Sequence, residues 1–431
     1  MRQPLSPMHL DPLPTQCLVD DALEIRVRGL RPGQAATFTL CSRFSDQLTV
    51  ASRACFHADG AGVIDLCRHA PVSGAYQGVD PMGLFWSRSP VPQGEVVDAA
   101  DLGNDPWTAT LVVESADPAA RLIHAVRRVY LGAGVTVRQV DHGGLVGKLF
   151  EHEDQVPRPS VLVVGGSNGG LGWSQEAAAL LASHGFTVLA LAYFAAPGLP
   201  PTLDRIPLEY FEAALQWLAS QPSVAPGGSG VVGVSRGGEL ALLLGAHSAQ
   251  VRCVVAYVPS GVVWPAYPAS GHGAWTLNGA EIPYASTLSH EQWDALLASG
   301  QALAGSFDWY LLPLRDPAYL ESVSIPVERI RGPVLLISGA DDGLWPSTDL
   351  AQLAVNRAQE KHFPHAIEHL VYQGAGHSIA WPGGPTTMLR SVHPVSGEDM
   401  DMGGTPQGNA QARVDSWPRV LAFLHRALQG D

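Results

Sequence analysis

One pentapeptide in the chain has the residue types and spacing of a nucleophile for acyl transfer. Residues 233–237 read G-V-S-R-G, which is the pattern G-x-S-x-G around Ser235. The turn that exposes such a serine is tight, and its glycines let the flanking strand and helix pass close together. The apolar run 230–234 and the Ala/Leu-rich run 237–247 supply that strand and helix. The alternative interpretation is a glycine-rich turn with an idle serine.

A serine hydroxyl is an effective nucleophile only when a base removes its proton. In hydrolases with this pentapeptide, the acid and the base follow the serine in the order Asp/Glu, His. Asp342 lies in a Gly/Asp turn after the apolar run 334–338, and we expect it to orient the base, with Asp341 as the alternative. His377 follows the last strand-like run, 366–372, behind a short glycine loop. It is the expected base.

Backbone N–H groups must stabilise the oxyanion that forms during acyl transfer. One is expected from Arg236, directly after the nucleophile. The second is expected from Ser167 or Asn168 in the glycine-rich loop 165–170, which follows the apolar run 161–164. This loop lacks the Gly-Lys-Ser/Thr of a phosphate-binding loop and has no clean G-x-G-x-x-G, so a nucleotide site is not expected.

Other potential ligand residues do not indicate a metal site or a cofactor. His362, His365 and His369 have a spacing that superficially suits a metal, but they lie in a polar loop that enters a strand. The five cysteines are odd in number and contain no C-x-x-C, which argues against a disulfide framework and a zinc ribbon. We expect no metal and no cofactor.

The elements that must position these residues change character along the chain. The first part has short alternating strands, such as 23–30 and 36–41, separated by Gly/Pro/Asp turns. This pattern predicts an immunoglobulin-like β-sandwich over residues 1–135. Nothing in it looks catalytic.

The second part alternates buried strands with helices. Besides the runs named above, strands are expected at 186–193 and 253–258, and helices at 174–183, 209–218 and 414–428. Such alternation predicts a mostly parallel sheet with helices on both faces. With the pentapeptide, it predicts an α/β-hydrolase domain over residues 136–431.

Composition limits the partners. The chain has 431 residues, 46% of them hydrophobic, so a large core is expected and general disorder is excluded. With 26 basic and 40 acidic residues, the net charge of −14 argues against nucleic-acid binding. The sequence shows no apolar secretory signal and no run long enough for a membrane span. We therefore expect a cytoplasmic protein, and the oligomeric state is left open.

Several segments, in order along almost the whole chain, resemble one family, the acyl-CoA thioesterase / bile acid-CoA:amino acid N-acyltransferase family. They are residues 27–30, 80–86, 185–194, 206–214, 233–235, 325–329, 338–342, 374–377 and 410–417. The resemblance implies acyl transfer from a thioester through an acyl-enzyme. It carries the catalytic triad over to Ser235, Asp342 and His377. Because amino-acid transferases of the family look to have cysteine as nucleophile, Ser235 favours hydrolysis of an acyl-CoA or acyl-carrier thioester.

Alternatives to hydrolysis are N-acyl transfer to an amino acid or other amine, a carboxylesterase, and an inactive hydrolase-fold binding protein. For substrate binding we expect Arg236, Trp264 and Trp381, the two tryptophans lying in irregular segments near the expected mouth of the site. The alternative for Arg236 is a salt bridge with Glu239 on the helix that Arg236 begins. The acidic balance is unfavourable for the phosphates of CoA, so a carrier protein or a simple ester remains an alternative.

Overall fold

The computed structural model of the protein describes residues 7–45, 47–92, 105, 107–116, 119–300 and 306–429. Contacts divide the chain into two compact units. The first unit consists of Met1–Gly132, Trp381–Leu389 and Thr405–Gln411, and the second of Ala133–Ala380, Arg390–Gly404 and Ala412–Asp431. The chain thus leaves the first unit close to the division predicted at residue 135. The two later segments that belong to the first unit were not foreseen.

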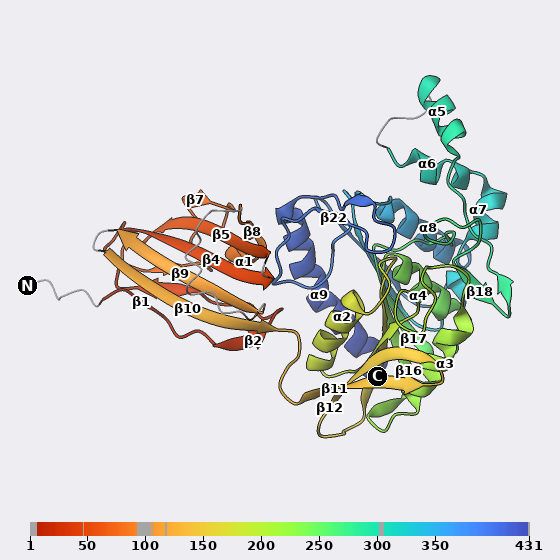
Figure 1. Ribbon diagram of the computed structural model, residues 1–431, viewed down its shortest axis with the longest axis horizontal. Coiled ribbons are helices and arrows are strands. Elements are labelled where there is room, and N and C mark those ends of the chain that lie inside the picture. The colour runs from red at the N-terminus through yellow and green to blue at the C-terminus, as the bar shows by residue number, and fades with distance from the viewer. Residues whose placement is uncertain are drawn as a thin grey trace, which may run out of the picture. The chain divides into compact units, whose positions relative to one another are not determined.

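The first unit consists mainly of two sheets. Its elements, red to orange in Figure 1, are β1 (His9–Leu10), β2 (Gln16–Leu18), β3 (Arg26–Arg28), β4 (Ala35–Ser45), β5 (Leu48–His57), β6 (Ile64–Asp65), β7 (Ser73–Gly74), α1 (Gly83–Trp86), β8 (Ser89–Pro90), β9 (Thr108–Ala116) and β10 (Ala119–Val129). One sheet has the order β1-β3-β6 and the other β2-β10-β9-β4-β5-β7, with β8 also paired to β5. The one parallel pair among the described strands of this unit is β2 with β10.

Side chains from both sheets form one apolar core. Val27 on β3 and Ile64 on β6 belong to the same buried cluster as Phe38 on β4 and Phe56 on β5. The two phenylalanine rings meet edge to face, with centroids 5.1 Å apart. Along most of β4, buried positions alternate with partly exposed ones, as the period of two requires. The first unit is therefore β-rich around a core of its own, and its immunoglobulin-like character stays a prediction.

The segment Trp381–Leu389 is hydrogen-bonded to the region around α1. The backbone N–H of Thr386 donates to the carbonyl of Trp86 at 2.9 Å, and its hydroxyl donates to the carbonyl of Pro406 at 2.7 Å. Arg88 donates to the carbonyl of Gly383 at 3.2 Å. These bonds tie a segment that begins four residues after His377 to a unit built mainly from the first part of the chain.

The second unit contains an eight-stranded sheet in the order β11-β12-β14-β13-β16-β17-β20-β21. Its strands are β11 (Val135–His142), β12 (Leu145–His152), β13 (Arg158–Val164), β14 (Thr187–Ala192), β16 (Val224–Val234), β17 (Val251–Tyr257), β20 (Val334–Gly339) and β21 (Ile367–Tyr372). β12 is antiparallel to both of its neighbours, and the pairs from β14 to β21 are parallel. The sheet is therefore mixed, and mostly parallel as predicted.

Helices and short elements surround this sheet. They are α2 (Gly172–Ser183), β15 (Ile206–Pro207), α3 (Leu208–Ala219), α4 (Arg236–His247), β18 (Trp275–Leu277), β19 (Ala280–Glu281), α5 (His290–Ala298), α6 (Asp308–Leu311), η2 (Pro313–Arg315), α7 (Pro317–Val323), η3 (Val327–Arg329), α8 (Ser347–Glu360), β22 (Arg390–Val392), β23 (Asp399–Asp401) and α9 (Pro406–Gln429). All residues of β14 and β20 are buried. Both faces of the sheet are therefore covered, as in α/β proteins.

Three parts of the structure depart from the sequence prediction. The region between β19 and β20 folds as α5, α6, η2, α7 and η3, where no helices were predicted (Figure 1). Helix α8 was also missed, and α9 begins eight residues before the predicted start. Among the described helices, none is both long and apolar enough to cross a membrane.

Replacing Thr386 by valine tests the attachment of the 381–389 segment. Valine keeps the shape of the side chain but leaves the carbonyl of Pro406 without the hydroxyl donor. We expect Thr386→Val to lower the free energy of unfolding by about 1–2 kcal/mol, measured by urea denaturation. Thr386→Ser keeps the hydroxyl and serves as the control. Equal stability of the valine variant and the wild type would contradict this role.

Candidate active site

Ser235 lies in a strained turn between β16 and α4. Its φ of 57° and ψ of −121° are unusual for a residue other than glycine. Its backbone N–H donates to the carbonyl of Tyr257 at the end of β17, at 2.8 Å. Such strain persists only where the surrounding structure imposes it. The strand, the turn and the helix predicted around Ser235 are all present.

The two glycines of the pentapeptide are required by close packing of the backbone. A Cβ atom on Gly233 would lie 2.0 Å from the carbonyl oxygen of Gly237. A Cβ atom on Gly237 would lie 2.2 Å from the carbonyl oxygen of Gly165, at the end of β13. No side chain fits at either position without moving the backbone.

His377 and Asp342 form a buried pair. Nδ1 of His377 lies 2.8 Å from Oδ2 of Asp342, and their side chains are 7% and 1% exposed. The other carboxylate oxygen accepts the N–H groups of Leu344 and Trp345 at 2.9 and 3.3 Å. Both oxygens of Asp342 are therefore held, and one of them fixes the orientation of the imidazole.

Asp341, the alternative to Asp342, has a different contact. Its Oδ2 accepts the N–H of Gly374 at 2.7 Å, in the loop that leads to His377. Among the described residues, no hydrogen bond joins Ser235 Oγ to His377. Bonds between nucleophile and base are often long in the absence of substrate and tighten in the complex.

The loop after β13 passes close to the nucleophile. A Cβ atom on Gly166 would lie 3.1 Å from the Cβ and 3.7 Å from the Oγ of Ser235. Ser167 and Asn168 are the central residues of a turn closed by the N–H of Gly169 on the carbonyl of Gly166. In the described part of the chain, no protein group accepts the N–H of Ser167 or Asn168. Both remain able to donate to a substrate.

The Arg236 side chain forms the salt bridge that was the alternative to substrate binding. Its Nε donates to Oε2 of Glu239 at 2.9 Å, and its two other nitrogens donate to the carbonyls of Pro265 and Trp264, each at 2.9 Å. Oε1 of Glu239 also accepts the indole N–H of Trp275 at 2.7 Å. Burial raises the pKa of Glu239, and the charge of Arg236 and these donors oppose that shift. The guanidinium therefore anchors the segment after β17 to the start of α4.

Trp264 lies in an apolar cluster next to the pair of His377 and Asp342. The cluster contains Trp345, whose ring centroid is 6.2 Å from that of His377. The Trp264 ring meets Tyr310 of α6 edge to face at 5.1 Å. Burial raises the pKa of Tyr310, which also responds to the charges of Arg236 and Asp342. Helix α6 therefore brings an aromatic side chain close to the predicted site.

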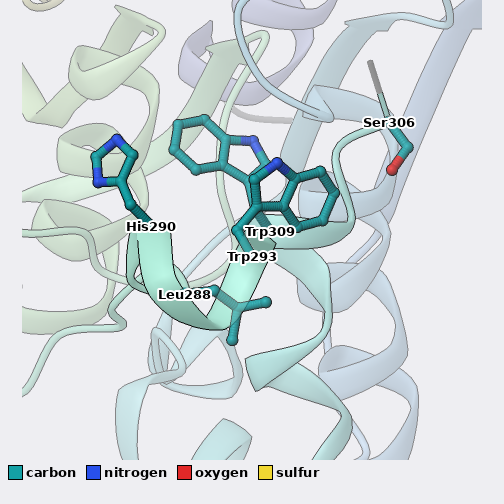
Figure 2. A pocket seen from close by; sticks show the side chains of 5 residues that line it. All are labelled: Leu288, His290, Trp293, Ser306 and Trp309. Atoms are coloured by element: carbon teal, nitrogen blue, oxygen red, sulfur yellow. The ribbon is translucent and has the colours of Figure 1, made fainter. Parts of the chain in front are cut away.

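A pocket of about 350 Å³ is lined by residues of α5 and of the segments beside it. Figure 2 shows its lining, in which the indoles of Trp293 and Trp309 lie between His290 and Ser306, with Leu288 nearby. The ring of Trp309 is 4.8 Å from that of Tyr310. Aromatic contacts therefore connect the pocket, through Tyr310, to Trp264.

Trp381, the other tryptophan expected to bind substrate, packs against an aromatic side chain. It belongs to the first unit, where it is 7% exposed and its ring meets Tyr130 at 5.8 Å. This is the contact of a packing residue, and Trp381 is left out of the site proposed below. His369, from the histidine group considered for a metal, lies beside Ser338 with Nε2 and Oγ 2.8 Å apart.

Sequence reasoning missed two residues that contact the predicted site. Trp345 packs beside His377, and Nε2 of His393 lies 3.0 Å from Oγ of Ser167. No local pattern distinguishes His393 from the other 15 histidines of the chain. Its importance follows only from its contacts across the fold.

Comparison with protein families gives two consecutive matches. Residues 20–142 match the acyl-CoA thioester hydrolase/BAAT N-terminal region, and residues 206–430 match the BAAT / acyl-CoA thioester hydrolase C terminal. The second match alone covers more than half of the chain. The chain belongs to the acyl-CoA thioester hydrolase/BAAT family. The resemblance noted in the sequence is confirmed, and with it the expectation of an enzyme.

Relatives within this family include both hydrolases and transferases. The chain is 32% identical to acyl-coenzyme A amino acid N-acyltransferase 1 of Mus musculus, covering 96% of each protein. It is also 32% identical to acyl-coenzyme A thioesterase 1 of Homo sapiens, covering 96% of this chain and 95% of the relative. Among solved structures, a dienelactone hydrolase-like promiscuous phosphotriesterase is 18% identical with a TM-score of 0.42, covering 68% of this chain and 99% of that one.

Gly233→Ala tests the close packing around the nucleophile. The added methyl group would overlap the carbonyl of Gly237, so strand and helix must separate. We expect a loss of stability of about 3 kcal/mol or more, measured by thermal unfolding. The control is Gly172→Ala, at an exposed position where a Cβ meets nothing within 4 Å. A Gly233→Ala variant as stable as the control would contradict the proposed constraint.

Proposed function

We propose that the protein is a serine-dependent acyl-thioester hydrolase that forms an acyl-enzyme on Ser235. The observation that carries the proposal is the buried pair of His377 and Asp342, joined at 2.8 Å. The two residues lie in loops that follow β21 and β20, parallel strands of the same sheet in which β16 leads to the strained Ser235 turn. The chain order of serine, acid and histidine is the one that α/β hydrolases use. Membership of the thioester hydrolase family supports a thioester as substrate.

The first half of the reaction transfers the acyl group to the enzyme. His377 takes the proton of Ser235 as the oxygen attacks the thioester carbonyl, and Asp342 stabilises the imidazolium that forms. The N–H of Arg236 and that of Ser167 or Asn168 donate to the oxyanion. When the intermediate collapses, the carbon–sulfur bond breaks and His377 protonates the leaving thiolate.

The second half releases the acid. His377 removes a proton from water, the oxygen of which attacks the acyl-serine. As the tetrahedral intermediate collapses, the bond between the acyl carbon and the Ser235 oxygen breaks, and the His377 imidazolium gives that proton to the Ser235 oxygen. An amine in place of water would give an amide, which is the reaction named for the mouse relative. Product analysis decides between the two. The acyl chain is assigned to the side of Trp264 and Tyr310, where the side chains are apolar and aromatic.

The test of this function is a panel of acyl-CoA thioesters and simple acyl esters, with intact-protein mass spectrometry. We expect free acid from the wild type, and an acyl adduct that Ser235→Ala abolishes. Product formation is then measured with and without glycine or taurine. An unchanged rate of acid release and no amide support hydrolysis, whereas amide formation supports the transferase. No turnover of any thioester or ester would refute both.

We expect the two adjacent aspartates to differ in their effect on kcat. Asp342→Asn removes the carboxylate that holds Nδ1 of His377, and we expect kcat to fall by about 10³–10⁴ with the fold retained. Asp341→Asn is the matched control, since this carboxylate accepts a backbone N–H in the loop. We expect its kcat to stay within about tenfold of the wild type. If Asp341→Asn lowered kcat more than Asp342→Asn did, Asp341 would be the carboxylate that orients His377.

A further inference from the structure

The segment Arg390–Gly404 contacts two different parts of the candidate site. It forms a hairpin in which β22, labelled in Figure 1, pairs with β23, with Arg390 opposite Asp401. The hairpin belongs entirely to the second unit. One end of the hairpin lies against the loops of His377 and Asp342. The other end lies against the loop after β13.

The end after β23 is bonded to the two loops that carry the buried pair. The backbone N–H of His377 donates to the carbonyl of Met402 at 2.7 Å. Gly403 forms a bridge with Asp342, and Gly404 with Ala375. The N–H of Gly404 also donates to the carbonyl of Asp341 at 2.9 Å. The hairpin therefore fixes the backbone on both sides of the histidine–aspartate pair.

The turn of the hairpin carries His393, which is 1% exposed. Its Nδ1 faces the backbone N–H groups of Val395 and Ser396, each at 3.2 Å, and so acts as an acceptor. In the neutral ring the hydrogen must then be on Nε2. That nitrogen lies 3.0 Å from Oγ of Ser167, to which it donates.

Other side chains hold the His393 ring in this orientation. Tyr267, from the segment after β17, packs against it edge to face at 4.7 Å. The hydroxyl of Tyr267 donates to Oε2 of Glu398 at 2.6 Å, and the N–H of His393 donates to the carbonyl of Glu398 at 2.8 Å. Burial lowers the pKa of His393, while the charge of Glu398 opposes that shift. Burial thus favours the neutral ring that the hydrogen bonds require.

We propose that His393 is a positioning residue that fixes the oxyanion-binding loop through the Ser167 hydroxyl. Because the same hairpin also holds the His377 and Asp342 loops, it sets the distance between the base and the oxyanion donors. This inference rests on the proposed function, in which the N–H of Ser167 or Asn168 stabilises the oxyanion. The Ser167 hydroxyl accepts from His393, so the loop is held by this hydrogen bond in addition to the one between Gly169 and Gly166 that closes its turn.

Three variants distinguish the loss of the hydrogen bond between His393 and Ser167 from a loss of hairpin stability. In His393→Asn, the amide oxygen can replace Nδ1 as acceptor within the turn, but no donor reaches Ser167. In His393→Gln, the longer amide can place its nitrogen near Nε2 and donate to Ser167. Ser167→Ala removes the acceptor and leaves the backbone N–H in place. His365→Asn makes the same histidine-to-asparagine substitution at an exposed position and serves as the control.

The measurements are kcat and KM for an acyl thioester and the rate of Ser235 labelling by a fluorophosphonate, whose phosphoryl oxygen occupies the same place as the oxyanion. Removing one oxyanion donor costs about 10²–10³ in kcat, so a misplaced loop is expected to cost about 10–100-fold, with KM within about threefold. We expect this loss in His393→Asn and Ser167→Ala, partial recovery in His393→Gln, and no further loss in the double variant His393→Asn/Ser167→Ala.

The inference is overturned if His393→Asn and Ser167→Ala keep kcat and labelling rate within about twofold of the wild type, or if their losses multiply in the double variant. If His393→Asn fails to fold, Ser167→Ala, which removes one oxygen atom, decides alone. Labelling of Ser235 does not need a thioester substrate. If the wild type is labelled but turns over no thioester or ester, the proposed function fails while the role of His393 is still measured by the labelling rates.

Discussion

The turn at Ser235 is the constraint on which the rest of the candidate site depends. A non-glycine residue with a φ of 57° is held there because β16 enters and α4 leaves with almost no space between them. The carbonyl oxygens of Gly237 and Gly165 occupy the positions where side chains would otherwise be. The buried strands on both sides of β16 keep the turn from relaxing. Strain at this residue is therefore a consequence of packing in the sheet.

A buried ion pair next to this turn holds the segments that follow β17. Arg236 and Glu239 are on the first turn of α4, and together they bind the backbone of Trp264 and Pro265 and the indole of Trp275. A buried ion pair is costly unless its remaining hydrogen-bonding groups are satisfied. Here main-chain carbonyls and indole or backbone N–H groups do so. The pair therefore fixes the backbone of Trp264 and Pro265 and the indole of Trp275 against the first turn of α4.

The two units are interleaved along the last quarter of the chain. Between His377 and α9 the chain enters the first unit at Trp381, returns to the second at Arg390, and enters the first again at Thr405. The chain segments directly before and directly after the hairpin therefore both belong to the β-rich unit.

The sequence by itself determined the local parts of the site. The pentapeptide, the apolar run before it and the helix-like run after it predicted Ser235 as the nucleophile. The chain order predicted Asp342 and His377, the side chains of which lie 2.8 Å apart in the fold. These signals are local because strand and helix periods and glycine turns depend on neighbouring residues. Only the tertiary structure decided that Arg236 binds Glu239, that Trp381 packs in the first unit, and that His393 reaches Ser167 across 226 positions of the sequence. Such contacts join residues far apart in the chain, and the spacing of apolar residues along the sequence does not predict them.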